Sequence, residues 1–403
     1  MKSYRWLMLV SALVLTFVTV LLAPLSHTSG QDISQKLGPL NQQVDYIKRE
    51  QIAPPEIKAR LTTLRQQLQT RNRRFTVGYT TAADVPIEVL AGTKIPRGLP
   101  GVTEKVNTRA RELMTIDRAE QQRAIQVNPN IFGHLQIKCS ASLKSWDWRK
   151  SGKVTPVKSQ ICGTCWDFTS MGAYEGSYAI RNNQMIDASE QHILNCASAG
   201  SCAGGWWMPV FDYMISNGTD SEAAHAFTGN DSLSCPTGHS TPYRATAWGF
   251  VGSNYTQIPP VGAIKQSLCE HGPNAIAVMV DSPFQHYTGG VFDETDQHFD
   301  WINHGVTLIG WDDTKGAWLI KNSWGTGWGE TGGFGSEKGY MWISYGSNNI
   351  GIATAWVDAK SRFYRLPIDW MKVLERDRLI VKPLPDPDPG PIVVRPDVVR
   401  PRP

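Results

Sequence analysis

The chain has 403 residues, of which 41% are hydrophobic and 19% charged, and its net charge is +4. The hydrophobic content and the 15 tryptophans exclude a mainly disordered chain. A single long apolar stretch excludes a multispanning membrane protein. A net charge this small gives no reason to expect nucleic acid as a partner. The length leaves room for two or three folded units.

Residues 1–30 have the pattern of an export signal. Lys2 and Arg5 precede an uncharged stretch from Trp6 to Leu25, and small residues follow before the chain turns polar. The pattern predicts a signal peptide, but 20 uncharged residues are also long enough for an uncleaved membrane anchor, and both readings stay open. In either case the rest of the chain is expected outside the cytosol, in a secreted, periplasmic or lysosome-like location. Membrane contact is expected only if residues 6–25 stay uncleaved.

Residues 31–140 form a basic segment in which helical patterns dominate. Its 17 Lys and Arg against 10 Asp and Glu give a net charge of +7. Periodic apolar residues predict helices over 54–74 and 103–127, and alternation over 74–79 predicts a short strand between them.

Residues 141–360 carry the opposite net charge, −8, from 12 Lys and Arg against 20 Asp and Glu. One strong helix is predicted over 165–180. Strands are predicted over 275–280, 304–311, 317–324 and 339–345. A helical first half and a strand-rich second half indicate an α+β domain of two lobes. Its charge indicates that it faces the basic segment.

Residues 361–403 are predicted to be a Pro-rich tail. A short amphipathic stretch at 370–379 leads into a segment in which eight of the last 21 residues are proline. Proline at this density favours extended polyproline II over a packed core. The tail is expected to be a solvated spacer, and a ligand for a groove-lined partner is the other reading.

The most informative segment surrounds Cys165, which stands where a glycine turn enters the predicted helix. A cysteine at a helix N-terminus meets the positive end of the helix dipole, which favours the reactive thiolate. Gln160 lies just upstream, where its amide is placed to donate to a developing oxyanion beside the backbone N–H of Cys165. Cys165 is therefore a candidate nucleophile.

A thiol nucleophile needs a base, and the base needs an orienting partner. His304 stands at the mouth of one apolar strand and Asn322 at the end of the next, so a hairpin of the two strands brings them together. Trp324 and Trp328 are placed to shield this pair from water. Four other histidines lie among polar residues and are expected at the surface: His225, His239, His286 and His298.

The sequence Cys-Gly-Thr-Cys-Trp at 162–166, with a His 139 residues and an Asn 157 residues beyond Cys165, resembles the papain/cathepsin family of cysteine proteases. Further segments match the family in order between residues 146 and 345: Trp148-Arg, Val154–Lys158, Ser189–Gln191, Cys202–Gly205 and Lys321–Gly329. The resemblance implies a two-lobed papain-like fold. It has a helical left lobe, a β-barrel-like right lobe and the active cleft between them.

The resemblance also assigns catalytic roles to four residues. Cys165 is expected to be the nucleophile, His304 the general acid/base, Asn322 the residue that orients His304, and Gln160 the oxyanion donor. The chain is then a secreted, monomeric cysteine endopeptidase proenzyme that hydrolyses peptide bonds through a Cys165 acyl-enzyme. An inserted loop with a histidine pair, which makes some relatives carboxypeptidases, is not found in the sequence. No metal or organic cofactor is implied.

Substrate contacts are expected along the cleft. Gly204 and Gly205 match the family's substrate-binding strand, whose backbone pairs with an extended peptide. Trp206 and Trp207 follow these glycines and are expected to line a pocket for an apolar side chain. Trp324 is also expected beside the substrate.

The seven cysteines agree with this family, because removing the nucleophile leaves six, enough for three bridges. The family pattern implies Cys162–Cys202 and Cys196–Cys235, and elimination leaves Cys139–Cys269. If this third bridge forms, maturation cuts upstream of Cys139 or leaves the fragment tethered. Residues 31–140 then become an inhibitory prosegment that acts on its own chain and is held to the acidic domain by charge. A solubilising spacer is the other reading.

Two positions depart from the family pattern. Only Ile161 separates Gln160 from Cys162, which shortens the oxyanion loop. Asp167 takes a place usually held by a small apolar residue. It is expected either to accept a hydrogen bond from a neighbouring strand or to raise the pKa of Cys165.

Other functions fit the sequence less well. A thiol–disulfide oxidoreductase using Cys162 and Cys165 lacks the strand that precedes that motif, and it leaves His304 and Asn322 unexplained. A zinc site lacks a second C-x-x-C or a spaced histidine pair. A catalytically weakened or inactive peptide-binding or surface protein on the same fold stays open as an alternative, because fold alone does not fix activity.

Overall fold

The computed structural model describes residues 43–135, 138–238, 240–294, 301–367, 370 and 372–373. The predicted signal or anchor, the Pro-rich tail, most of the stretch at 370–379, His239 and His298 lie outside the described residues. Within the described ranges, no helix is both long and apolar enough to cross a membrane.

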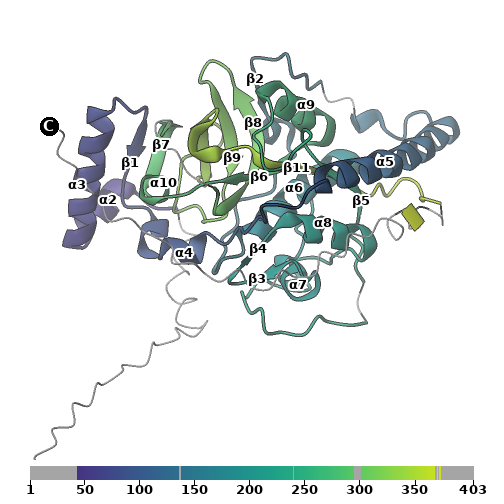
Figure 1. Cartoon of the computed structure of the whole chain (residues 1–403), viewed down its shortest axis with the longest axis horizontal. Coiled ribbons are helices and arrows are strands. Elements are labelled where there is room, and N and C mark those ends of the chain that lie inside the picture. Colours follow the sequence, from purple (N-terminus) through teal and green to yellow (C-terminus); the bar gives the residue numbers. More distant parts are fainter. Residues whose placement is uncertain are drawn as a thin grey trace, which may run out of the picture.

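The basic segment forms two helical pieces at opposite ends of the molecule (Figure 1). Its elements are α2 (Tyr46–Gln51), α3 (Pro55–Thr70), β1 (Phe75–Val77), α4 (Ile87–Leu90) and α5 (Val102–Val127). The Asp45 side chain accepts from the first backbone N–H groups of α2 and so begins that helix. Pro55 stands in the first turn of α3, where its missing N–H costs nothing.

The helical lobe is organised around α6 (Cys165–Asn182), which is buried along nearly its whole length. An added Cβ at Gly172 would lie 2.4 Å from Thr307 Oγ1, so only glycine lets α6 approach the sheet this closely. The other elements of this lobe and of its connections are α7 (Glu190–Cys196), β3 (Gly200–Ser201), β4 (Gly204–Gly205), α8 (Trp207–Ser216), α9 (Val261–His271) and α10 (Ser282–Gln285).

The strand lobe is one nine-stranded sheet. Eight of its strands follow the order β1-β7-β10-β9-β8-β6-β11-β5, and the ninth, β2, pairs with β8 outside this order. Its strands after β1 are β2 (Ser145–Asp147), β5 (Ala245–Phe250), β6 (Asn274–Val278), β7 (Tyr287–Phe292), β8 (His304–Asp312), β9 (Ala317–Lys321), β10 (Tyr340–Ser344) and β11 (Ile352–Ala359). Only β10 and β7 pair in parallel. The lobe expected to resemble a barrel is thus an open sheet between the edge strands β1 and β5.

The cysteines pair as the sequence analysis expects. Disulfides join Cys139 to Cys269, Cys162 to Cys202 and Cys196 to Cys235. Cys165 alone of the seven cysteines, all of which lie in described ranges, is free. Because Cys162 is bonded to Cys202, it is not the redox partner of Cys165, and the oxidoreductase reading loses its basis.

Most predicted elements are confirmed. The helices predicted over 54–74, 103–127 and 165–180 are α3, α5 and α6, and the four predicted strands are β6, β8, β9 and β10. The strands β5, β7 and β11 were not predicted. The surface position expected for His286 is wrong, because its side chain is fully buried and its Nδ1 lies 3.1 Å from the carbonyl oxygen of Gly78.

Candidate active site

Cys165 is the first residue of α6 and is fully buried. Its thiol therefore lies at the positive end of the helix dipole. Burial raises its pKa, but the charge and hydrogen bond of His304 and hydrogen bonds from Thr93 and the Gly305 backbone lower it to about 7. A large share of this thiol is consequently thiolate at neutral pH.

The predicted hairpin brings His304 and Asn322 together. His304 begins β8, Asn322 directly follows β9, and the two strands pair antiparallel. His304 Nε2 lies 2.8 Å from Asn322 Oδ1. Because the amide oxygen only accepts, Nε2 donates, and Nδ1 is left for Cys165.

Aromatic rings enclose the His304–Asn322 hydrogen bond. The ring centroid of Trp324 lies 4.8 Å from that of His304, and Phe284 lies 6.5 Å away. Trp328 stacks on Phe284 at 5.5 Å, and all three aromatic side chains are fully buried. Exclusion of water strengthens the hydrogen bond that orients the imidazole.

Gln160 keeps its donor aimed at the site despite the short loop. Its Nε2 donates to the carbonyl oxygens of Leu90, at 3.0 Å, and of Cys162, at 2.8 Å. Its Oε1 accepts from Ser323 Oγ at 2.7 Å, which fixes the amide orientation. Trp324 Nε1 also donates to the Leu90 carbonyl, at 3.3 Å. A backbone carbonyl of the basic segment thus occupies the donors of this site.

The basic segment continues directly over the nucleophile. The backbone N–H of Gly92 donates to Cys165 Sγ at 3.2 Å, and Thr93 Oγ1 lies 3.1 Å from the same sulfur. No sequence motif marks these two residues, and the sequence analysis did not identify them. An added Cβ at Gly92 would lie 1.9 Å from the carbonyl oxygen of Gly163, so the passage is too narrow for any side chain.

The same segment pairs with the expected substrate-binding strand. Gly205 N donates to Gly92 O at 2.9 Å, and Lys94 N donates to Gly205 O at 2.8 Å. Thr93 forms a parallel bridge with Gly205. Gly204 takes a φ of +127°, and an added Cβ there would lie 2.5 Å from Gly92 O. The two glycines let another backbone lie flat against them.

Trp206 and Trp207 do not open a pocket in this structure. Trp206 is 5% exposed, and its ring lies 6.2 Å from that of Tyr255. Trp207 is fully buried and donates to the carbonyl oxygen of Ala353 at 3.2 Å. Both rings therefore belong to the core beneath the glycine strand. Trp324, by contrast, touches both His304 and the Leu90 carbonyl.

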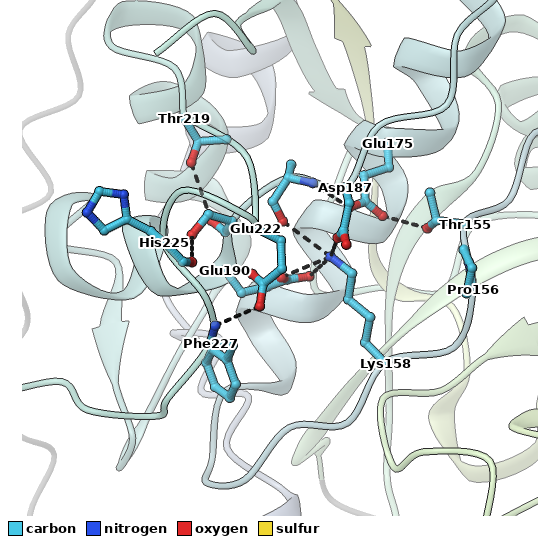
Figure 2. Close-up of polar contacts among 12 residues, drawn as sticks. Thr155, Pro156, Lys158, Glu175, Asp187, Glu190, Thr219, Glu222, His225 and Phe227 are labelled. Carbon is cyan, nitrogen blue, oxygen red and sulfur yellow. Dashed lines mark hydrogen bonds and ion pairs between the residues drawn. The ribbon is translucent and has the colours of Figure 1, made fainter. Parts of the chain in front are cut away.

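Two buried carboxyl groups, of Glu175 and Glu190, and the exposed one of Asp187 surround Lys158 Nζ (Figure 2). Lys158 Nζ lies 2.6 Å from Asp187, 2.8 Å from Glu190 and 3.0 Å from Glu175. One ammonium group is shared among these three carboxyl groups, two of which are buried. Burial, reinforced by the charge of Glu175, therefore raises the pKa of Glu190 to about 8 despite Lys158.

Asp167 lies at the edge of this cluster and is fully buried. Burial and the charge of Glu190 raise the pKa of its carboxyl well above the ordinary value. Neither carboxyl oxygen has a hydrogen-bond partner among the described residues, so the expected bond to a neighbouring strand does not form. The main influences on the pKa of Cys165 do not include Asp167.

Comparison with known proteins agrees with this geometry. The model of the papain family cysteine protease matches residues 143–359, and the chain belongs to this family. It is 37% identical to cathepsin K of Mus musculus over 51% of this chain and 60% of that protein, and 33% identical to digestive cysteine proteinase 3 of Homarus americanus over 52% and 64%. The match thus spans less than two thirds of either relative.

Solved structures extend the likeness in fold beyond residues 143–359. A digestive procathepsin L 3 from the larval midgut of Tenebrio molitor aligns with a TM-score of 0.57 at 23% identity, over 81% of this chain and 98% of that one. A recombinant stem bromelain precursor aligns with a TM-score of 0.55 at 24% identity, over 82% and 97%. The fold of the chain is therefore the two-lobed papain-like α+β fold.

Proposed function

We propose that the chain is a secreted cysteine endopeptidase proenzyme, with residues 31–140 as its inhibitory prosegment and residues 141–360 as its catalytic domain. The observation that carries this proposal is a free cysteine at a helix N-terminus whose pKa His304 lowers, while Asn322 holds His304 through a 2.8 Å hydrogen bond. This is the arrangement that thiol-based acyl transfer needs.

The proposed reaction has two stages. The Cys165 thiolate attacks the peptide carbonyl carbon, and Gln160 Nε2 with the backbone N–H of Cys165 stabilises the oxyanion. Protonated His304 gives its proton to the leaving amine, which leaves a thioester on Cys165. His304 then takes a proton from water, the hydroxide attacks the thioester, and the carboxylic product leaves Cys165 free. Asn322 holds the imidazole in line for both proton transfers.

Inhibition in the proposed proenzyme is direct occupation of the cleft. The Leu90 carbonyl takes the Gln160 donor, Gly92 and Thr93 contact the sulfur, and Gly205 is paired along its backbone. No substrate reaches the thiol while residues 90–94 stay there.

Charge attraction supports this docking in part. Arg74 pairs with Asp293 and Arg109 with Asp212, each joining the basic segment to the acidic domain. In a third pair the charges are reversed, because Asp117 of the basic segment pairs with Arg181 of the acidic domain. The opposite net charges of the basic segment and the acidic domain therefore predict an attraction between them, but they do not predict which residue of each ion pair is the basic one.

Secretion is part of the proposal and rests on the cysteines. Six of the seven cysteines form disulfides, which persist only in an oxidising compartment. The apolar stretch at 6–25 is the proposed export signal, or the anchor if it stays uncleaved. The Pro-rich tail is proposed to be a spacer.

The proposal is tested with an epoxysuccinyl-peptide probe, which alkylates active-site thiolates. The wild-type chain and its Cys165→Ala variant are acidified with mild reductant, treated with the probe and mapped by mass spectrometry. We expect labelling at Cys165 in the wild type and no labelling in the variant. Absence of labelling after residues 90–94 have left the cleft would favour the non-catalytic peptide-binding protein instead.

A further inference from the structure

We infer that the basic segment has two fates: residues up to about 97 leave on activation, whereas α5 stays on the catalytic domain as a permanent part of the mature protein. The cut that separates them falls in the loop between the cleft and α5, at Arg97–Leu99. This inference rests on the proposed function, because it names a processing site in the same proenzyme.

The first observation is that α5 closes an open edge of the catalytic sheet. β5 is the last strand in the sheet order, with only β11 beside it. The Asn107 amide of α5 accepts from Phe250 N at 2.8 Å and donates to Phe250 O at 3.0 Å. It also donates to Gly252 O at 3.1 Å. The Asn107 side chain thus makes the backbone hydrogen bonds that a neighbouring strand would make to Phe250. Loss of α5 would leave these backbone groups of β5 unpaired.

The second observation is an ion pair under α5 between a buried arginine and a half-buried aspartate. Arg109 is 2% exposed and pairs with Asp212 of α8, and its guanidinium lies 5.8 Å from the ring of Trp248. Trp248 Nε1 donates to Asp212 at 2.7 Å. Removal of α5 would strip Asp212 of its cation and uncover the fully buried Trp248. Departure of α5 would therefore cost this ion pair and the burial of the Trp248 ring.

The third observation is that the chain stays anchored beyond the middle of α5. Asp117 pairs with Arg181 and accepts from Tyr364 Oη at 2.6 Å. Phe132 then packs edge-on against the Tyr364 ring at 5.9 Å. The Cys139–Cys269 disulfide follows a few residues later and ties this stretch covalently to α9.

None of these contacts lies in the cleft. α5 is at one end of the molecule, and α2 and α3 are at the other (Figure 1). Activity requires residues 90–94 to leave, but it does not require α5 to leave.

The loop between them has the features of a processing site. Residues 96–101 belong to no helix or strand. Arg97 and Gly98 are exposed, and Gly98 takes a φ of +82°. Exposed loops of this kind are the preferred sites of proteolytic cleavage. The Leu99–Pro100 bond has no amide N–H, so the cut falls at Arg97–Gly98 or Gly98–Leu99.

The cleavage is ordinary peptide hydrolysis by a second copy of the enzyme. Its Cys165 forms a thioester with the carbonyl carbon of residue 97 or 98, and the new amino terminus leaves with a proton from His304. Water then hydrolyses the thioester.

The first experiment sequences the N-termini of the full-length wild-type chain after acid activation, with the disulfides intact and the epoxysuccinyl probe bound. We expect a labelled catalytic chain that begins at residue 98 or 99 and contains α5. Labelling with a start beyond Val127 and a separate α5 peptide would overturn the inference but not the proposed function. Absence of both labelling and cleavage would count against the proposed function alone.

A second experiment tests retention of α5 without relying on activity. In the Cys165→Ala chain, recognition sequences for a sequence-specific protease are inserted after Gly98 and after Asn128, and both are cut. On acid size-exclusion chromatography, the fragment with α5 is expected to elute with the catalytic domain after the first fragment has separated. Its departure before or together with the first fragment would overturn the inference.

Two substitutions on α5 control this retention test. Arg109→Met keeps the bulk of the side chain but removes the charge on Asp212, and we expect at least a tenfold loss of retained α5 fragment. Gln122→Ala, at an exposed position of the same helix, is the matched control and should leave retention unchanged.

Discussion

Cys165 and Asp167 stand two residues apart in the first turn of α6, and both are fully buried, yet burial has opposite outcomes for them. Burial raises the pKa of each group. At Cys165 the imidazole of His304 outweighs burial and lowers the pKa to about 7. At Asp167 the influence of Glu190 adds to burial, and the charge of Lys158 does not outweigh the two.

The comparison shows that the direction of the pKa shift of a buried side chain depends here on the charged groups around it and not on the extent of its burial. The two sides of α6 accordingly have different tasks. One side presents the reactive Cys165 thiolate to the cleft, and the other places the Asp167 carboxyl, whose pKa is raised, in the domain core.

Removing the cation that faces Cys165 should have the largest effect. In His304→Ala, burial of Cys165 is opposed only by Thr93 and the Gly305 backbone, so its pKa rises above 7. Loss of the proton donor adds to this, and we expect kcat/KM on a peptide substrate to fall by roughly 10³-fold or more. The measurement uses activated enzyme, and unchanged circular dichroism shows that the variant is folded. Activity within tenfold of wild type would contradict the assigned role.

Loosening the same imidazole without removing it should have a smaller effect. In Asn322→Ala, His304 Nε2 loses its 2.8 Å partner while Trp324 still packs on the ring. We expect kcat to fall by roughly 10- to 100-fold with little change in KM, because the substrate contacts remain. A change in KM alone would show that Asn322 shapes the cleft and does not position His304.

The raised pKa values of Asp167 on α6 and Glu190 on α7 predict that the free energy of unfolding falls as pH rises. Glu190 has a pKa of about 8 in the folded chain against an ordinary 4.5, and that of Asp167 is also raised. Between the unfolded and folded values the folded state binds more protons. The stability from these groups is thus complete below their ordinary pKa values and is lost as pH rises through the folded ones.

Asp167→Asn tests this dependence. The substitution removes the titrating group, and we expect the free energy of unfolding at about pH 8 to rise by about 1–3 kcal/mol, with no gain at about pH 4. Urea unfolding of the Cys165→Ala chain at the two pH values measures it, with the exposed Glu88→Gln as control. An equal effect at both pH values would mean that packing, not protonation, is responsible.

Removal of one hydroxyl beside the sulfur should have the smallest effect. Thr93 Oγ1 lies 3.1 Å from Cys165 Sγ and lowers its pKa. In Thr93→Val we expect the pKa of Cys165 in the full-length chain to rise by roughly 0.5. Thiolate ultraviolet absorbance against the Cys165→Ala chain measures it, and Thr76→Val on β1 is the control. A fall in this pKa would show that the hydroxyl does not stabilise the thiolate.

The sequence predicts best the elements whose pattern is local. Leu61, Leu64 and Leu68 are spaced for one helical face, and all three are buried in α3. The hairpin that joins His304 to Asn322 follows from two apolar strands with a short turn.

Elements defined by long-range contacts were not predictable in this way. β5 and β11 are buried on both faces, so their residues lack the alternation that marks a half-buried strand. The buried His286 contacts Gly78, about two hundred residues earlier, and no local pattern indicates such a contact. The contacts of Gly92 and Thr93 with Cys165 likewise depend on the path of the folded chain, which no motif records.

The contact between Gly92 and Gly163 leaves room for only a hydrogen atom on the α-carbon of Gly92. In Gly92→Ala the added methyl group would collide with the carbonyl oxygen of Gly163 and push residues 90–94 out of place, whereas Cys165, His304 and Asn322 would be unchanged. Most damaging substitutions in a protease silence it. Gly92→Ala is therefore expected to weaken inhibition of the proposed enzyme and not its catalysis.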